Sequence, residues 1–393
     1  RVLPIYQSTT FKYDTSEQMA RLFDLEDSGY FYTRLQNPTN DAVAAKIAAL
    51  EGGVAAMLTS SGQAANFYAI FNICQAGDHF VCSSAIYGGT FNLFGVTMKK
   101  LGIDVTFVNP DASEEEISAA FKPNTKALFG ETISNPSLEV LDIEKFARIA
   151  HSHGVPLIVD NTFPTPINCR PFEWGADIVV HSTTKYMDGH AVQVGGAIID
   201  SGNFSWSPER YPGMKEYKKY GKFAYLVKLR NGIWRNMGGC LAPMNAYLNI
   251  IGMETLGLRM ERVCNNAFRL AQALEKLEGV SVNYPLLESS PYHELAEKQL
   301  SGKGGAILTI RAGSKERAYK LINHLKYVKI ATNIGDVRTL VIHPASTIYI
   351  HSTPEAMAEA GVYDDTIRIS VGIEDIKDLI RDFTEAVESL GEE

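Results

Sequence analysis

The most constraining feature of the sequence is an alternation of short apolar runs with helix-like segments between about residues 40 and 200. Apolar runs separated by helices are typical of parallel strands buried on both faces of a sheet. In such sheets, ligands bind beyond the carboxyl ends of the strands. The runs are HFVCSS at 79–84, IDVTFVNP from 103, TKALFGET from 125, VPLIVDNT from 155, ADIVVHST from 176 and VGGAIID from 194. We therefore expect an α/β protein whose chemistry gathers at the polar residues that close these runs: Ser83, Glu131, Asp160, His181 and Ser182.

The rest of the chain predicts an arm and a second, smaller domain. From about residue 240 a long helical pattern leads into the segments GGAILTIRA, TLVIHPAS and TIRISVG, and then into a terminal helix. These segments indicate an α+β domain at 239–393, after an N-terminal arm at 1–35 and a large domain at 36–238. A charged, aromatic stretch at 205–223 has no helix or strand period and predicts an exposed connection. In the large domain, a helix is expected to begin at a capping signal at Thr39–Asn40.

Composition excludes several classes of protein. The 37 basic and 45 acidic side chains leave a net charge of −8, which argues against a nucleic-acid partner. No stretch of about 18 uncharged apolar residues is present, so we expect no membrane contact. The sequence begins at Arg1 and not at Met, so we expect residues to precede it. Five scattered cysteines without metal-ligand spacing predict free thiols, no metal site and a cytoplasmic location: Cys74, Cys82, Cys169, Cys240 and Cys264.

Two apparent motifs fail on inspection. SGKGG at 301–305 lacks the first glycine and the Ser/Thr of a phosphate loop, and HELAE at 293–297 lacks the second histidine of a zinc helix. Neither a GxGxxG nor a GxSxG sequence occurs. Nicotinamide dehydrogenases and serine hydrolases are therefore disfavoured.

The densest polar cluster is HSTTKYMDGH, in which Lys185 follows a predicted strand directly. A lysine of this kind is more often a surface cation. Ser182 and Thr184, however, lie two residues apart and point to one side of an extended segment, where their hydroxyls suit a phosphate. A lysine beside a phosphate site is a candidate for Schiff-base chemistry.

Three further residues or segments could complete such a site. Asp160 closes the preceding run, where its carboxylate could pair with a protonated pyridine nitrogen or serve only as a turn residue. Gly62 and Gln63 open a helix whose first amide groups could hold a phosphate, although a start of this kind is often only structural. Tyr87 could stack on a planar ring or simply pack in the interior.

Taken in order, these motifs resemble the Cys/Met-metabolism family of pyridoxal-phosphate-dependent enzymes over essentially the whole chain. The matching motifs are PIYQSTTF, YTRLQNPT, SSGQAA, YGGTF, ETISNP, VDNTF, HSTTKY, NIGD, LVIHPAST and IRISVGIED. The resemblance implies a fold-type I architecture, which is α/β with a mostly parallel sheet, helices on both faces and a smaller C-terminal α+β domain. It also implies pyridoxal 5'-phosphate as the cofactor.

The same resemblance implies a role for individual residues. Lys185 would bind the cofactor covalently and act as the catalytic base, Asp160 would pair with the pyridine nitrogen, and Thr162 would pack near the ring. Tyr87 would stack on the ring and assist the leaving group. The phosphate would be held by Gly62, Gln63, Ser182 and Thr184, with Tyr32 and Arg34 of the partner subunit. The substrate carboxylate would be bound by Arg368, Asn333 and Asn135.

The reaction is indicated by smaller differences within the family. Gly89 stands where methionine γ-lyase relatives usually carry a cysteine, which argues against a lyase. The motifs YTRLQNPT, DSGNFSW, ETLGLRMER and LVIHPASTI are most similar to those of O-acetylhomoserine sulfhydrylases. This similarity implies a γ-replacement in methionine biosynthesis, in which O-acetyl-L-homoserine and sulfide or methanethiol yield homocysteine or methionine and acetate.

Several alternatives stay open at this stage. A cystathionine γ-synthase or a γ-lyase would share most of these motifs. A non-catalytic protein with this fold is disfavoured, because it would have no need to keep Lys185, Asp160 and Arg368 together. The acyl group, the sulfur donor and the choice between dimer and tetramer are not decided. The resemblance implies at least a dimer with shared active sites and, because members of the family are usually homotetramers, a dimer of dimers. Related sulfhydrylases carry an acidic, histidine-containing loop near the position of Met214, so this loop is short or residues are absent there.

Overall fold

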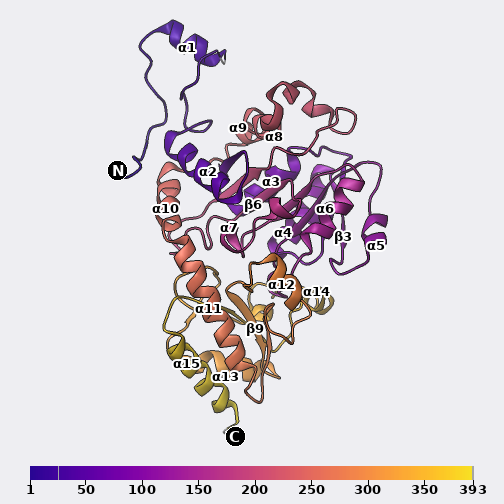
Figure 1. Ribbon diagram of the computed structural model, residues 1–393, viewed down its shortest axis with the longest axis vertical. Helices are drawn as coiled ribbons and strands as arrows, with labels where there is room; N and C mark the ends of the chain where they lie inside the picture. The colour runs from indigo at the N-terminus through magenta and orange to yellow at the C-terminus, as the bar shows by residue number, and fades with distance from the viewer. Residues whose placement is uncertain (25, 392–393) are drawn as a thin grey trace.

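The computed structural model of the chain describes residues 1–24 and 26–391, so Leu25, Glu392 and Glu393 lie outside the described residues. Figure 1 shows three parts along the long axis: an extended arm that carries α1, a sheet flanked by helices, and a smaller domain at the C-terminal end. The helices are α1 Ser16–Phe23, α2 Pro38–Glu51, α3 Gly62–Phe71, α4 Gly88–Asn92, α5 Glu114–Ala119, α6 Ile143–Ser152, α7 Thr165–Asn168, α8 Ala224–Leu229, α9 Arg235–Met237, α10 Pro243–Met253, α11 Leu256–Leu274, α12 His293–Gln299, α13 Lys315–His324, α14 Pro354–Glu359 and α15 Ile376–Glu388. The strands are β1 Ala55–Thr59, β2 His79–Ser83, β3 Asp104–Val108, β4 Thr125–Glu131, β5 Leu157–Asp160, β6 Ile178–His181, β7 Gly196–Asp200, β8 Ser281–Asn283, β9 Ile307–Arg311, β10 Lys329–Ile330, β11 Leu340–Ile342 and β12 Thr366–Ser370.

The larger sheet is mostly parallel, with the strand order β1-β7-β6-β5-β4-β2-β3 among the described residues. Strands β2 to β6 pair in parallel, and β7 is antiparallel to both β6 and β1. All six runs expected from the sequence form strands, β2 to β7. Strand β1 was not expected, because its short run AAMLT directly follows the apolar helix α2 and has no alternation of its own. The expected α/β fold with a mostly parallel sheet is confirmed.

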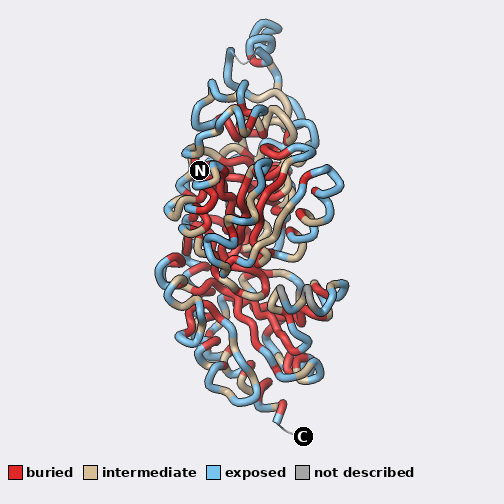
Figure 2. Tube along the Cα trace, turned by 90° about the vertical axis from the view of Figure 1, so that its right-hand side faces the viewer, coloured by how far each residue is buried: buried red, intermediate tan, exposed pale blue. Residues whose placement is uncertain are grey.

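Alternate residues of each central strand enter two different cores. Val159 and Val179 pack on the side of α2 and α6, whereas Ile158 and Ile178 pack on the side of α3 and α8. Successive residues of a strand point to opposite faces of the sheet. Because both faces are buried here, the residues on both faces must be apolar. This double burial explains the near-continuous apolar runs, and Figure 2 shows the resulting buried interior in red beneath an exposed arm.

Helix α2 begins two residues earlier than the sequence indicated. Asn37 is its N-cap, and the Asn37 side chain accepts a hydrogen bond from the Thr39 amide. Pro38 occupies the first helical position, where a missing N–H has no cost. The expected cap at Thr39–Asn40 was therefore wrong, because Asn37 and Pro38 together make the stronger start signal. The helix ends at Gly52 in the left-handed conformation.

The smaller domain is built on a second sheet with the order β10-β11-β12-β9-β8, against which α11 and α15 pack. The long helical pattern after residue 240 is two helices, α10 and α11. The stretch at 205–223 is more ordered than expected. It contains a 3₁₀ helix at Pro212–Phe223, and Tyr211 and Met214 within the stretch are buried. The domain boundaries at residues 35 and 238 remain predictions.

In the part of the chain that the structure describes, no helix combines the length and the apolar character that crossing a membrane requires.

Candidate active site

A cavity of about 270 Å³ opens beyond the carboxyl ends of β4, β5 and β6, between the two domains. The parallel order of these strands brings their polar end residues to one edge, as the sequence predicts. The second domain closes the opposite wall with β12 and the segment at 332–334. The lining residues are Ser61, Gly62, Gln63, Asn66, Tyr87, Thr90, Glu131, Asn135, Asp160, Thr162, Phe163, Ser182, Thr184, Lys185, Val194, Thr332, Asn333, Ile334, Ile348 and Arg368.

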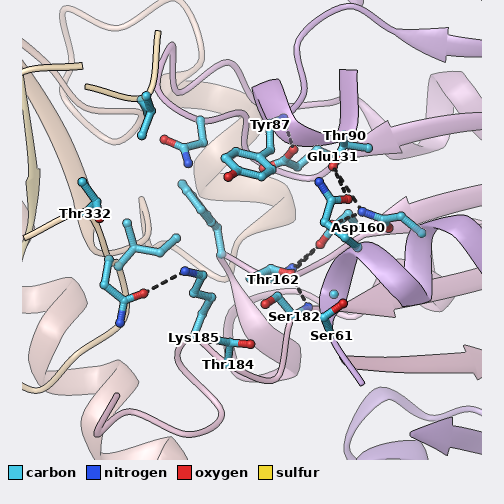
Figure 3. A pocket seen from close by; sticks show the side chains of 18 of the residues that line it. Ser61, Tyr87, Thr90, Glu131, Asp160, Thr162, Ser182, Thr184, Lys185 and Thr332 are labelled. Atoms are coloured by element: carbon cyan, nitrogen blue, oxygen red, sulfur yellow. Dashed lines mark hydrogen bonds between the residues drawn. The ribbon is translucent and has the colours of Figure 1, made fainter. Parts of the chain in front are cut away.

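Lys185 lies in the turn after β6 with its amine inside the cavity (Figure 3). Its Nζ donates a hydrogen bond to Asn333 Oδ1 at 2.7 Å. Burial, with a smaller contribution from the positive charge of Arg368, lowers the pKa of Lys185 to about 8. A substantial fraction of this amine is therefore neutral near physiological pH, as a nucleophile or a base must be.

Asp160 lies at the end of β5, on the floor of the cavity. Its Oδ1 accepts hydrogen bonds from the amide and the hydroxyl of Thr162, at 3.0 and 2.5 Å, and its Oδ2 faces Asn66 Nδ2 at 3.4 Å. Burial raises the pKa of Asp160, and the bonds from Thr162 oppose this effect. A cationic N–H group above this carboxylate would relieve the cost of burying its charge.

The N-terminus of α3 meets the turn after β6 at the side of the cavity. The amides of Gly62 and Gln63 belong to the first turn of α3, where they have no helical acceptor. A Cβ atom on Gly62 would lie 2.6 Å from the Cβ of Ser182, so only glycine permits this approach. The positive end of the helix and the nearby Ser182 hydroxyl form a cradle for an anion. The Thr184 hydroxyl also lines the cavity, but it is already hydrogen-bonded to the backbone of Gly195.

Tyr87 is the N-cap residue of α4, is 41% exposed and lines the cavity, where a flat ligand could stack on its ring (Figure 3). Its amide donates a hydrogen bond to Glu131 Oε2 at 2.7 Å. A Cβ atom on Gly89 would lie 2.5 Å from the Tyr87 ring and 2.7 Å from Gln63 Nε2. This tyrosine position therefore requires glycine at residue 89.

Arg368 reaches the cavity from β12 and is only 4% exposed. Its guanidinium donates to Asn135 Oδ1 at 3.0 Å and to the Asn333 carbonyl at 3.2 Å, while its Nε has no partner among the described residues. Burial lowers the pKa of Arg368 to about 10. A buried guanidinium whose partners are neutral, with a donor to spare, is suited to bind a carboxylate.

Tyr32 and Arg34 do not reach this cavity. They lie in the arm, where the Arg34 guanidinium stands 5.2 Å from the centre of the Tyr32 ring and donates to the Arg235 carbonyl. The other expected site residues, from Gly62 to Arg368, all line the cavity. The role of the two arm residues in a neighbouring subunit therefore stays a prediction.

The structure adds polar lining residues to which the sequence assigned no role, among them Asn66 and Glu131. Asn66 lies one helical turn after Gly62, so a spacing of four residues could have indicated it. Glu131 ends β4 in register with Asp160, and burial, with a smaller contribution from the neighbouring Asp160 carboxylate, raises the pKa of Glu131 well above the usual range. Glu131 was noted as the end of a run, but its contact with Tyr87 depends on the loop after β2.

The chain is similar to known proteins over almost its whole length. The family described as Cys/Met metabolism PLP-dependent enzyme matches residues 1–388. Similar curated proteins include an O-acetyl-L-homoserine sulfhydrylase of Corynebacterium glutamicum, 46% identical over 97% of this chain and 91% of the relative. O-acetyl-L-homoserine sulfhydrylase 1 of Thermus thermophilus is 43% identical over 98% of this chain and 95% of the relative. The homocysteine synthase of Schizosaccharomyces pombe is 44% identical over 99% of this chain and 94% of the relative.

A solved structure agrees with these relatives. The crystal structure of a protein described as an O-acetylhomoserine (thiol)-lyase from Campylobacter jejuni superposes with a TM-score of 0.94, at 35% identity, over 98% of this chain and 95% of that one. That structure contains a pyridoxyl-lysine monophosphate residue.

Proposed function

The chain belongs to the Cys/Met-metabolism family of pyridoxal-phosphate-dependent enzymes, and from this premise we propose that it converts O-acetyl-L-homoserine and a small thiol to L-homocysteine or methionine and acetate. The observation that supports the proposal is that Lys185, Asp160 and Arg368 line the same cavity, and that the Nε of Arg368 has no hydrogen-bond partner among the described residues. The named activities of the relatives supply the choice of substrate.

The residues present fit the cofactor. The glycine-lined cradle at Gly62 suits its phosphate, Asp160 suits its pyridinium nitrogen, and the exposed face of Tyr87 suits its ring. When bound, pyridoxal phosphate withdraws electrons from the substrate carbon next to the amine, so that a proton can leave. We assign Gly62, Gln63, Ser182 and Thr184 to the phosphate, and Thr162 to the side of the ring, where it holds Asp160.

Lys185 is the group that moves the proton at the substrate Cα. Its Nζ lies inside the cavity, and its lowered pKa leaves much of it free to accept a proton. Asn333 accepts a hydrogen bond from this amine and so limits where the amine can point. We assign to Tyr87, which lies across the cavity from Lys185 in Figure 3, the role of assisting the departing acetate.

Arg368 holds the substrate by its carboxylate. Asn135 and the Asn333 carbonyl fix two edges of the guanidinium, and the remaining Nε faces no protein acceptor among the described residues. Asn333 contacts Arg368 through its backbone carbonyl and Lys185 through its side chain, so the carboxylate-binding group and the base are held against the same residue. This arrangement orients the substrate before the proton is removed.

The charges around the cavity support an uncharged acyl group and a donor without a carboxylate. Among the described lining residues the cations are Lys185 and Arg368, and both already have roles. A succinyl or phosphoryl ester, or cysteine as donor, would bring a second anion without a partner. Val194, Ile334 and Ile348 instead supply an apolar wall. This charge balance favours a sulfhydrylase over a cystathionine γ-synthase, and Gly89 argues against a γ-lyase.

We further propose that the enzyme acts as a homotetramer, a dimer of dimers, in the cytoplasm. Val2, Met19 and Phe23 of the arm expose large apolar side chains, which a neighbouring subunit would cover. Arg34 and Tyr32 would then complete the phosphate site of that neighbour. The five cysteines are free, which suits a reducing compartment.

A panel of substrates tests the function. We expect the purified enzyme with pyridoxal phosphate to form homocysteine from O-acetylhomoserine and sulfide. Its kcat/KM for this pair should be at least ~10-fold higher than for the succinyl or phosphoryl ester, or for cysteine as the donor. The reason is that each of those compounds would bring an unpaired charge into the cavity. Homocysteine, methionine, cystathionine and keto acid are measured by mass spectrometry. Keto acid as the main product would point to a γ-lyase, and cystathionine as the main product to a cystathionine γ-synthase.

The pKa of Lys185 predicts the pH dependence of cofactor uptake. Only the neutral amine reacts, so the rate at which the apo protein takes up pyridoxal phosphate should rise with pH and level off above about 8. An ordinary lysine, with a pKa of 10.5, would give a rate that still rises at pH 9.5. Stopped-flow absorbance measures this rate, and a rise that continues beyond pH 9.5 would contradict the lowered pKa.

A further inference from the structure

A buried polar cluster lies behind the floor of the cavity, and the proposed reaction does not use it. It consists of Glu51, Thr132, Asn161 and His181, and none of these four side chains is more than 1% exposed. Glu51 is the last residue of α2, which packs on the face of the sheet opposite to α3. The cluster therefore lies on the far side of the sheet from the anion cradle.

The Glu51 carboxylate contacts residues at the ends of two strands and is linked to a third through Asn161. Glu51 Oε1 accepts a hydrogen bond from Asn161 Nδ2 at 3.0 Å and is also hydrogen-bonded to His181 Nε2. Asn161 Oδ1 in turn accepts from the Thr132 hydroxyl at 2.9 Å. His181 ends β6, Asn161 follows β5 and Thr132 follows β4. The chain of contacts thus runs across the ends of all three strands.

Each strand-end member of the cluster is the sequence neighbour of a residue that lines the cavity. Thr132 follows Glu131, Asn161 follows Asp160, and His181 precedes Ser182. Successive residues of an extended chain point to opposite faces, so the cavity groups and the cluster share one stretch of backbone. Figure 3 shows Glu131, Asp160 and Ser182 on the cavity side. Any shift of the cluster must move these three groups relative to one another.

The cluster has an energetic cost that packing alone does not explain. Glu51 Oε2 is buried and has no hydrogen-bond partner among the described residues. An unsatisfied buried carboxylate oxygen is unfavourable, and apolar residues of similar size often replace buried charge pairs without loss of stability. A buried polar group of this kind can instead specify one arrangement of the strands around it.

We propose that Glu51 is a positioning residue, which sets the spacing of the ends of β4, β5 and β6 and thereby the affinity of the cavity for pyridoxal phosphate. This proposal rests on the cofactor site and not on the identity of the acyl ester or the thiol. A protein that binds the cofactor but makes no homocysteine would therefore leave it intact.

The test compares Glu51→Ala with Glu51→Gln. Titration of the apo proteins with pyridoxal phosphate, followed by absorbance, gives the Kd. We expect Glu51→Ala to raise the Kd at least ~10-fold, as loss of a supporting partner does behind metal ligands. It should also shift the pH midpoint of the cofactor absorbance band. Glu51→Gln keeps the Oε1 acceptor for both neighbours and should restore the Kd to within ~3-fold of the wild type.

A matched control separates positioning from stability. Val43 lies in the same helix, is fully buried in the core and is not part of the cluster. Val43→Ala should lower the Tm but leave the Kd and the absorbance midpoint unchanged. Three outcomes would each overturn the proposal. The Kd for pyridoxal phosphate could stay at the wild-type value in Glu51→Ala, or it could rise as much in Val43→Ala as in Glu51→Ala. The third outcome is a Kd in Glu51→Gln as high as that in Glu51→Ala.

A second variant serves if Glu51→Ala does not fold. Thr132→Val is nearly isosteric and removes the hydroxyl, which donates to Asn161 Oδ1 at 2.9 Å and also lies 3.3 Å from the Asp160 carbonyl oxygen. It should raise the Kd for pyridoxal phosphate several-fold, and a wild-type Kd in this folded variant would overturn the proposal.

Discussion

Replacing Lys185 with alanine is expected to lower kcat for homocysteine formation by at least ~10³-fold, because the base that moves the Cα proton is lost. The amine lies in the cavity, is held by Asn333 and has a pKa lowered to about 8. Among the described residues that line the cavity, it is the only amine. The variant should also lose the absorbance band of the covalently bound cofactor. Steady-state assays and spectra of the purified protein measure both effects.

A second substitution at this position separates charge from basicity. Lys185→Arg keeps the positive charge, but a guanidinium does not release its proton near neutral pH. We expect the same loss in kcat as for alanine. Lys276→Ala, which removes an exposed lysine far from the cavity, should keep wild-type activity. Normal turnover by Lys185→Ala would refute the assignment of this residue.

Replacing Arg368 with alanine is expected to raise KM for O-acetylhomoserine on the order of 10²- to 10³-fold, the usual cost of truncating one member of a buried charge pair. Burial of the guanidinium, which is 4% exposed, keeps water from replacing it. The carboxylate it binds does not react, so KM should change more than kcat. Arg368→Lys should recover only part of the loss, since an ammonium does not bind a carboxylate in bidentate fashion.

The control for Arg368 is an arginine of the same sheet outside the cavity. Arg311 pairs with Asp365 at 2.8 Å, and its side chain is 49% exposed. Arg311→Lys should leave KM unchanged. Affinity for pyridoxal phosphate should also be unchanged in Arg368→Ala, because the cofactor groups contact the opposite wall. An unchanged KM in Arg368→Ala would show that the substrate carboxylate binds elsewhere.

Much of the cofactor half of the site could be predicted from the sequence. Lys185 and Asp160 each follow an apolar run, and the ends of parallel strands meet at one edge, so local pattern was enough to bring them together. The start of α3 at Gly62 was visible in the same way. Arg368 came only from the resemblance to a family, since an arginine within TIRISVG has no local mark of burial. Strand β1 and the cap at Asn37 were missed because competing local signals lay beside them.

The sequence by itself determined where the strands lie, where their polar ends fall and which segment carries the lysine, because these properties depend on neighbours within a few residues. Only the tertiary structure decided that Asn333 contacts both Arg368 and Lys185, that Glu131 accepts a hydrogen bond from the amide of Tyr87, and that Glu51 contacts Asn161 after β5. These contacts link residues that are 35 positions apart for Arg368 and Asn333, 44 for Glu131 and Tyr87, 110 for Glu51 and Asn161, and 148 for Lys185 and Asn333. Such contacts depend on strand order and on how helices pack across the sheet, which no local pattern encodes.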